Sequence, residues 1–134
     1  MKRLIKLSIK ALLLATLLTV PISGAVLADD GTIDMVVSPN VLNLESNGGS
    51  ISVHTDIGYV RAAEAILEVN GTPVSVYTFA DSCGNLVVKA SINTVKGMVT
   101  AGKDAIFDLT YICNGVTYTG SDTVPVIQVI PQKQ

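Results

Sequence analysis

Apolar and polar residues alternate along most of the chain after residue 30. In the segment 50–57, mostly apolar side chains stand at the odd positions and polar ones at the even positions. Alternation with a period of two is typical of a β-strand that buries one of its faces. From this alternation, and from short runs rich in Val and Ile, the sequence predicts strands at 32–37, 41–45, 50–57, 65–69, 74–79, 85–91, 105–113, 116–119 and 123–130.

Turn-forming residues separate these segments. Asn-Gly dipeptides at 70–71 and 114–115 tolerate the positive φ angles of a tight hairpin turn. The stretch 46–49, Ser-Asn-Gly-Gly, predicts a third hairpin turn between the segments on either side of it. Pro125 in the last segment favours an edge position or a strand end there, because proline has no N–H to donate to a neighbouring strand.

One segment departs from the alternation. Ile92, Val95 and Val99 recur at helical spacing, which predicts one or two helical turns that cross between sheets. No segment is long enough for the helix of a βαβ unit, so the pattern predicts an all-β fold. The expected architecture is an antiparallel two-sheet sandwich of about 7–8 strands with a short helical turn in one crossover.

The first 28 residues have the parts of a secretory signal peptide. Basic residues occupy positions 2, 3 and 6, and an apolar stretch covers 11–20. Val26-Leu27-Ala28 then has the small residues of a cleavage site. The apolar stretch is too short to cross a bilayer core of ~30 Å as a permanent helix, although a retained anchor is the alternative. We therefore expect export to the periplasm or cell exterior with cleavage after Ala28, a domain at 29–130 and a loose tail at 131–134.

Charge divides sharply between these two parts. Four of the nine basic residues lie in the first 28 positions, and all eleven acidic residues follow them. The exported part therefore has five basic and eleven acidic residues, a net charge of −6. This balance argues against nucleic acid or an anionic membrane surface as a partner, because neither finds a basic patch. It is typical of a soluble secreted domain without stable membrane insertion.

Two cysteines, Cys83 and Cys113, remain in the exported part. In an oxidising compartment, two thiols in one small domain usually form a disulfide; the alternative is a pair of buried reduced thiols. If 85–91 and 105–113 pair as antiparallel neighbours, both cysteines lie at one end of that strand pair. We therefore predict a Cys83–Cys113 disulfide, which would contribute ~3–4 kcal/mol by loop entropy.

The order of several segments resembles a known family. Residues 36–44, followed by a glycine turn and an alternating strand, form one half of the likeness, and residues 85–89, 107–110 and 120–124 form the other. This order is similar to a small Ig-like β-sandwich module found in secreted and surface proteins of bacteria and archaea. The resemblance implies an Ig-like sandwich that serves as a non-catalytic accessory or binding module.

Modules of this kind often have an aspartate-rich turn, suited to calcium, before the strand that corresponds to 85–91. Here that turn holds one carboxylate, Asp81, and one amide, Asn85. Calcium takes six to eight oxygen ligands, several of them from carboxylates. We therefore expect no strong calcium site at Asp81 and no other cofactor, with Cys83 replacing the metal as a staple.

Few residues in the chain are suited to catalysis. His54 is the one histidine, and it shares a strand face with Ser52 and Asp56, where neighbours stand side by side instead of converging on a pocket. A single histidine also disfavours zinc or copper. Glu64 and Glu68 are expected to be solvated. We therefore expect no enzyme; a small secreted hydrolase with paired acids is the alternative.

Loops at one end of the sandwich, or an edge strand, are the expected contact surfaces. The expected partner is a protein or a glycan at the cell surface. A self-assembling surface subunit, joined through the strand at 124–130, is a further alternative. The candidate binding residues are Asn47, Gly48, Asn70, Asn114 and Tyr118.

Overall fold

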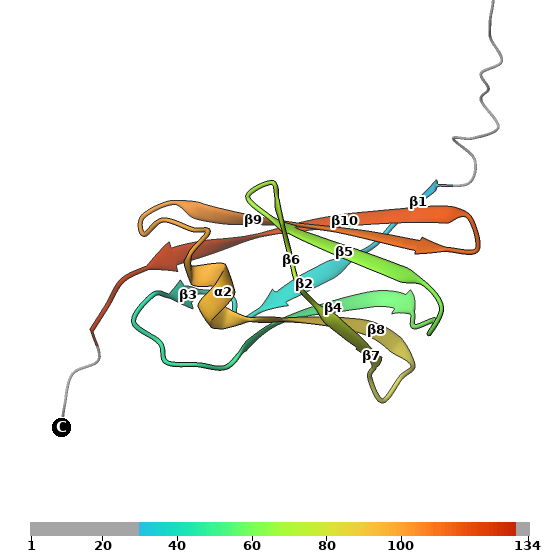
Figure 1. The fold of residues 1–134 in the computed structure, drawn as a ribbon, viewed down its shortest axis with the longest axis horizontal. Helices are drawn as coiled ribbons and strands as arrows, with labels where there is room; N and C mark the ends of the chain where they lie inside the picture. Colours follow the sequence, from blue (N-terminus) through green and yellow to red (C-terminus); the bar gives the residue numbers. More distant parts are fainter. Residues whose placement is uncertain (1–29, 131–134) are drawn as a thin grey trace, which may run out of the picture. The chain divides into compact units, whose positions relative to one another are not determined.

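A computed structural model describes residues 30–130, which form two β-sheets packed face to face (Figure 1). The predicted signal peptide at 1–28 and the predicted tail at 131–134 lie outside the described residues. The expectation of an all-β two-sheet sandwich is confirmed. No helix among the described residues is long and apolar enough to span a membrane.

The larger sheet has six strands. Their order is β1 (Asp30–Thr32), β10 (Val116–Ile127), β9 (Asp104–Cys113), β5 (Glu64–Val69) and β6 (Thr72–Val74), with β3 (Leu42–Asn43) also beside β10. The β9–β10, β5–β9 and β5–β6 pairs are antiparallel, and the β3–β10 pair is parallel.

The smaller sheet has four antiparallel strands. Their order is β2 (Met35–Ser38), β4 (Ser50–Gly58), β8 (Asn85–Ser91) and β7 (Tyr77–Ala80). A short helix, α2 (Ile92–Lys96), begins where β8 ends and lies in the connection to β9 in the other sheet. The predicted helical crossover between sheets is therefore confirmed, with a helix of five residues.

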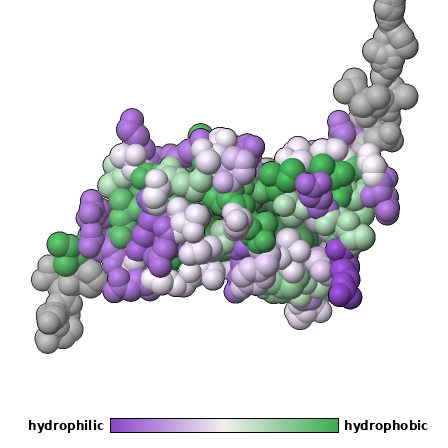
Figure 2. Space-filling view, in the orientation of Figure 1, coloured by the Kyte–Doolittle hydropathy of each residue, from purple (hydrophilic) through white to green (hydrophobic). Residues whose placement is uncertain are grey.

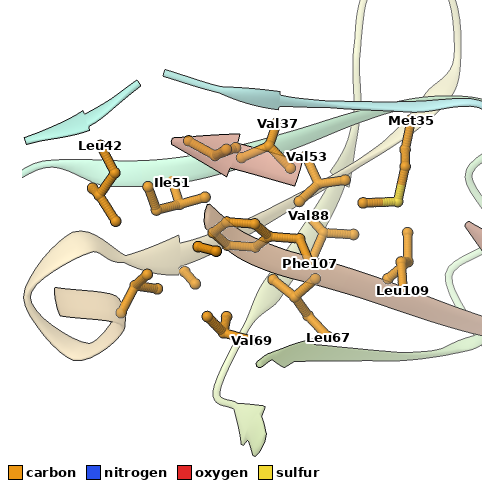
Figure 3. Packing of buried hydrophobic residues seen from close by; sticks show 14 of the residues in the cluster. Met35, Val37, Leu42, Ile51, Val53, Leu67, Val69, Val88, Phe107 and Leu109 are labelled. Atoms are coloured by element: carbon orange, nitrogen blue, oxygen red, sulfur yellow. The ribbon is translucent and has the colours of Figure 1, made fainter. Parts of the chain in front are cut away.

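The core lies between the sheets and follows from the alternation in the sequence. Phe107 of β9 is fully buried and its ring lies among Val53 and Val88 from the small sheet and Leu67 from the large one (Figure 3). Alternating residues of β8 and β9, from Leu86 to Ala90 and from Ala105 to Tyr111, belong to this cluster, and Cys113 packs against it. Apolar burial of this kind stabilises by roughly 25 cal/mol per Å².

Two tight turns are also confirmed. Val69 pairs with Thr72 and Cys113 with Val116, so each Asn-Gly dipeptide forms a two-residue hairpin loop. Both residues of each dipeptide have positive φ, with Asn70 and Asn114 at 52°. Asn and Gly tolerate this conformation best, which is why the dipeptide predicts the turn.

The predicted pairing of 85–91 with 105–113 is wrong. The first segment is β8 of the small sheet and the second is β9 of the large one. Both strands bury one face, and alternation reports only which face is buried, not which neighbour supplies the hydrogen bonds. The two strands therefore lie in different layers, with their buried faces turned to the core.

Three further strand predictions need correction. The stretch 46–49 is no hairpin, because β3 pairs with β10 and β4 pairs with β2. The segment predicted at 74–79 divides into β6 and β7, which belong to different sheets. The last two segments form one strand, β10; Pro125 pairs with Asp104 of β9 and lies near the end of β10, just before the two residues that pair with β3.

Candidate functional site

The outer face of the small sheet carries an unusual row of side chains. The strand registers place Val36, His54, Val87 and Phe79 side by side across all four strands. Val87 points away from the core, since its neighbours Leu86 and Val88 are core residues, and yet it is only 1% exposed. Other side chains on this outer face therefore cover it, and the row, with Val36, Val87 and Phe79, is partly apolar.

Two aromatic rings project from this face at its border. Tyr77 is 60% exposed and Phe79 is 37% exposed, and both lie on β7. Their ring centroids are 6.2 Å apart and their planes meet at 27°. The Nζ of Lys89, on the neighbouring strand, lies 5.6 Å from the centroid of Phe79, within the range of a cation–π contact. Exposed aromatic pairs of this kind are enriched at binding surfaces.

The main chain of β7 has a free edge. The N–H of Asp81 donates to the carbonyl of Asn85, so these two residues form a hydrogen-bonded pair with β8. Such pairs alternate along an antiparallel ladder, and the register then makes Phe79–Val87 and Tyr77–Lys89 hydrogen-bonded pairs as well. The N–H and C=O groups of Thr78 and Ala80 consequently point away from β8, toward the open side.

The other strands at the ends of the two sheets have features that hinder strand addition. The N–H of Val37 in β2 donates to Oδ2 of Asp122 at 2.8 Å, which occupies that edge with a carboxylate. Pro73 lies at the centre of β6 and has no N–H to offer. On the remaining edge β1 and β3 have only three and two residues. Prolines, charges and short strands are the usual devices that prevent strand addition; β7 has four residues and contains neither a proline nor a charged residue.

This arrangement can bind an extended polypeptide. A strand placed beside β7 would receive hydrogen bonds from Thr78 and Ala80, and its outward side chains would meet Tyr77 and Phe79. Hydrophobic surface is visible in the middle of the view in Figure 2, on the side that also shows the passage from β6 to β7 in Figure 1. β7 is therefore the strand whose edge and face together are best suited to contact another chain.

The loop residues predicted from sequence divide between the two ends of the sandwich. Asn47 and Gly48 precede β4, in a segment fixed to α2 through the Lys96 Nζ hydrogen bond to the carbonyl of Ser46. Asn70 lies at the same end, because its Nδ2 donates to the carbonyl of Met98. Asn114 lies at the far end of β9. The structure therefore does not bring these four residues together.

Two of the candidate residues have structural contacts of their own. Oδ1 of Asn70 accepts from the N–H of Ile106 at 2.9 Å, so this amide joins the β5–β6 turn to both β9 and the segment after α2. Tyr118 lies inside β10, and its ring packs against the core and against Gly31. These contacts explain both residues without a ligand, and their role in binding stays a prediction.

The turn at 81–85 is braced by its own carboxylate. Oδ1 of Asp81 accepts hydrogen bonds from the N–H groups of Cys83 and Asn85, at 2.8 and 2.9 Å. Within residues 30–130, no three acidic, histidine or cysteine side chains are grouped to hold a metal ion. A single carboxylate already engaged by two amides does not fit calcium, which requires several such ligands.

Both cysteines lie at the end of the sandwich that holds this turn. Cys83 is exposed in the β7–β8 turn, and Cys113 is the last residue of β9. The N–H of Tyr59 donates to the carbonyl of Gly84, and the hydroxyl of Tyr111 bonds the main chain of Val60, so one loop connects the two regions. Both are free thiols in this structure, and the disulfide stays a prediction.

A shallow open hollow of about 450 Å³ lies beside His54. Asp34, Asp56, Asn85 and Ser121 also line it. Oδ1 of Asp56 accepts from the N–H of Asp34 at 3.0 Å, so this carboxylate secures β4 to the residue before β2. Glu64 and Glu68 lie elsewhere, on β5 in the large sheet.

Sequence reasoning did not single out Tyr77, Phe79 and Lys89. A usable signal was present, because two aromatic residues two positions apart share one face of a strand. Treating 74–79 as one strand concealed it, since the border position of β7 depends on the switch from one sheet to the other.

A scan against protein-family models and a search of curated proteins found no match to the chain.

Proposed function

We propose that the chain is a secreted, non-catalytic Ig-like module that binds a partner polypeptide at or outside the cell surface by strand addition to β7. One observation carries this proposal: among the strands that end the two sheets within residues 30–130, β7 presents outward main-chain groups and has neither a proline nor a carboxylate bonded to its edge. The aromatic rings of Tyr77 and Phe79 beside this edge would provide the apolar contact.

Strand order supports the Ig-like assignment. In immunoglobulin constant-type sandwiches, strands A, B, E and D form one sheet and strands G, F and C the other. Here β2, β4, β8 and β7 occupy the positions of the first sheet, and β10, β9 and β5 those of the second. The helix α2 lies in the connection that corresponds to E–F. This fold class is compatible with many functions, so the proposed function depends on the site.

The environment of His54 supports a non-catalytic role. A base in a nucleophilic mechanism needs a third group that orients its ring. The nearest carboxylate in sequence on that strand face, Asp56, accepts a main-chain hydrogen bond from Asp34 instead. The hollow at this place is therefore organised by structural contacts between β4 and the approach to β2.

Capture of partners by purified variants tests the proposal. Wild-type residues 29–134, Phe79→Lys and Val36→Lys are immobilised and exposed to the surface and secreted fractions of the source cell. Val36 is a matched control, because it is 62% exposed in the same row of the same face but lies on the opposite strand. We expect the wild type and Val36→Lys to retain the same partner and Phe79→Lys to lose it.

The captured partner must then bind again as a purified protein. Equal retention by all three variants would contradict the assignment of β7 as the binding strand. Catalytic turnover of a captured molecule that depends on His54 would contradict the non-catalytic assignment. Circular dichroism of each variant checks that the substitution has not unfolded the sandwich.

A further inference from the structure

We infer that the polypeptide which fits the β7 edge is a second copy of the same chain, paired antiparallel through β7 about a twofold axis at Phe79. This inference rests on the proposed function and names its partner. It joins two four-stranded sheets into one continuous sheet of eight strands.

The outward main-chain groups determine the register. Thr78 and Ala80 each direct an N–H and a C=O to the open side, and in an antiparallel pair such residues must face residues of the same kind. Pairing Thr78 with Ala80 of the other copy, and the reverse, satisfies every outward group within β7. Phe79 then faces Phe79 of the other copy in a non-hydrogen-bonded pair, where Cα atoms are ~4.5 Å apart.

This register also matches the side chains. Phe79 and its equivalent would lie directly opposite on the outer face, and each Tyr77 would lie diagonal to the other copy's Phe79. Aromatic pairs across neighbouring strands are favourable, and diagonal neighbours at ~7–8 Å remain within reach of large rings. The four rings would form one cluster over the twofold axis and cover the aromatic surface that a single chain exposes.

Charge at the edge permits two copies to meet. The exported chain has a net charge of −6, which opposes self-association in general. β7 itself, Tyr-Thr-Phe-Ala, is uncharged. The charges that flank it are the cation of Lys89 and the carboxylate of Asp81, whose Oδ1 is already engaged by two main-chain N–H groups of its own turn. Carboxylates on strands of the large sheet, at Glu64, Glu68 and Asp108, belong to the other layer. An uncharged edge is therefore the place where an acidic chain can approach its own copy.

Symmetry limits the assembly to a dimer. A twofold contact uses the same strand of both copies, so neither copy keeps an open β7 edge afterwards. The sequence also suggested self-assembly through 124–130. In that segment, however, β10 already pairs with β9 on one side and, at Val126 and Ile127, with β3 on the other. A four-residue strand pairing lies at the small end of protein interfaces, so we expect a dissociation constant on the order of 100 μM.

Sedimentation equilibrium of purified residues 29–134, from about 10 μM to 1 mM, tests the inference. The wild type should shift from monomer to dimer across this range and form nothing larger. Phe79→Lys should weaken the dimer at least tenfold, because it places two lysines directly opposite each other. Ala80→Pro should do the same by removing an outward N–H, while Val36→Lys should leave the dissociation constant within about twofold.

Each result decides between alternatives. A wild type that stays monomeric at 1 mM would overturn self-pairing, while strand addition to a different partner would still stand or fall with the capture experiment. A dimer that persists in Phe79→Lys and Ala80→Pro would place the contact elsewhere and overturn the inference. Thermal unfolding of each variant shows whether it is folded. Phe79→Lys acts through charge and Ala80→Pro through a lost N–H, so if one variant fails to fold, the other still tests the inference.

Discussion

Tyr111 shows how one buried side chain fixes the loop between the two sheets. Its hydroxyl accepts a hydrogen bond from the N–H of Val60 at 2.7 Å and donates to the carbonyl of the same residue at 3.2 Å. The ring belongs to the core cluster. The sequence contains no signal for the partner of its hydroxyl, which lies 51 residues away along the chain.

Removal of this hydroxyl tests its contribution. Tyr111→Phe keeps the ring and loses both hydrogen bonds, so we expect the free energy of unfolding to fall by about 1–2 kcal/mol. Urea denaturation of wild type and variant measures the difference. Tyr59→Phe is a control, because Tyr59 is in the same loop and only partly buried. A loss no larger than that of the control would contradict the role of Tyr111.

The same hydroxyl predicts a pH dependence. Burial raises the pKa of Tyr111 above the ordinary value of 10.0, and its hydrogen bond with the main chain of Val60 offsets part of this shift. The folded state therefore holds this proton more tightly than the unfolded state. Its contribution to stability is complete below about pH 10 and is lost as the pH rises above that value. Tyr111→Phe should show a smaller alkaline loss of stability, and equal losses would contradict this account.

Asn70 and Asn114 form a matched pair with different roles. Both have a φ of 52° in an Asn-Gly turn, but the amide of Asn70 also bonds Ile106 and Met98. Replacement by Ala costs each turn about 1 kcal/mol from the left-handed backbone. We expect Asn70→Ala to cost about 1–2 kcal/mol more than Asn114→Ala, because two hydrogen bonds are lost as well. Thermal melts of both variants provide the measurement, and equal melting temperatures would contradict the structural role of Asn70.

At the scale of elements, the sequence predicted strands well and their neighbours poorly. The segment 85–91 coincides with β8, and both Asn-Gly turns lie where expected. The division of 74–79 between β6 and β7 escaped prediction because it depends on a chain crossing between layers. Period-two patterns record the buried face of a strand and not its partner. The candidate site was not predicted for the same reason, since an open edge depends on the order of strands in the sheet.

The segment from Ile33 to Met35, where β1 leads into β2, packs closely against Gly120 of β10. A Cβ at Gly120 would lie 2.5 Å from the carbonyl oxygen of Ile33 and 3.2 Å from Sδ of Met35. We expect Gly120→Ala to destabilise the domain by about 1–3 kcal/mol, since a main-chain atom must move. Gly58→Ala is the control, because a Cβ there has no neighbour within 4 Å. Chemical denaturation of both variants measures the effect, and equal stabilities would show that this close approach is unimportant.

At the scale of the whole molecule, the two cysteines lie in regions that belong to different sheets. The predicted disulfide would therefore join the β7–β8 turn of the small sheet to β9 of the large one, and not two neighbouring strands. If the chain is exported as predicted, the intact mass of residues 29–134 should be two hydrogens below that of the reduced form. A double replacement by Ala should lower the melting temperature, because a loop of this length contributes ~3–4 kcal/mol when closed. Alkylation of both thiols without prior reduction would contradict the disulfide.

Hydrogen exchange at β7, followed residue by residue by NMR in dilute protein, tests most directly whether this edge is open. The N–H groups of Tyr77 and Phe79 face β8 and should exchange slowly, whereas those of Thr78 and Ala80 should exchange quickly. Addition of a strand partner, or self-pairing at high concentration, should slow Thr78 and Ala80 selectively. Slow exchange of Thr78 and Ala80 in the dilute monomer would mean that the edge is already covered, and would contradict the account.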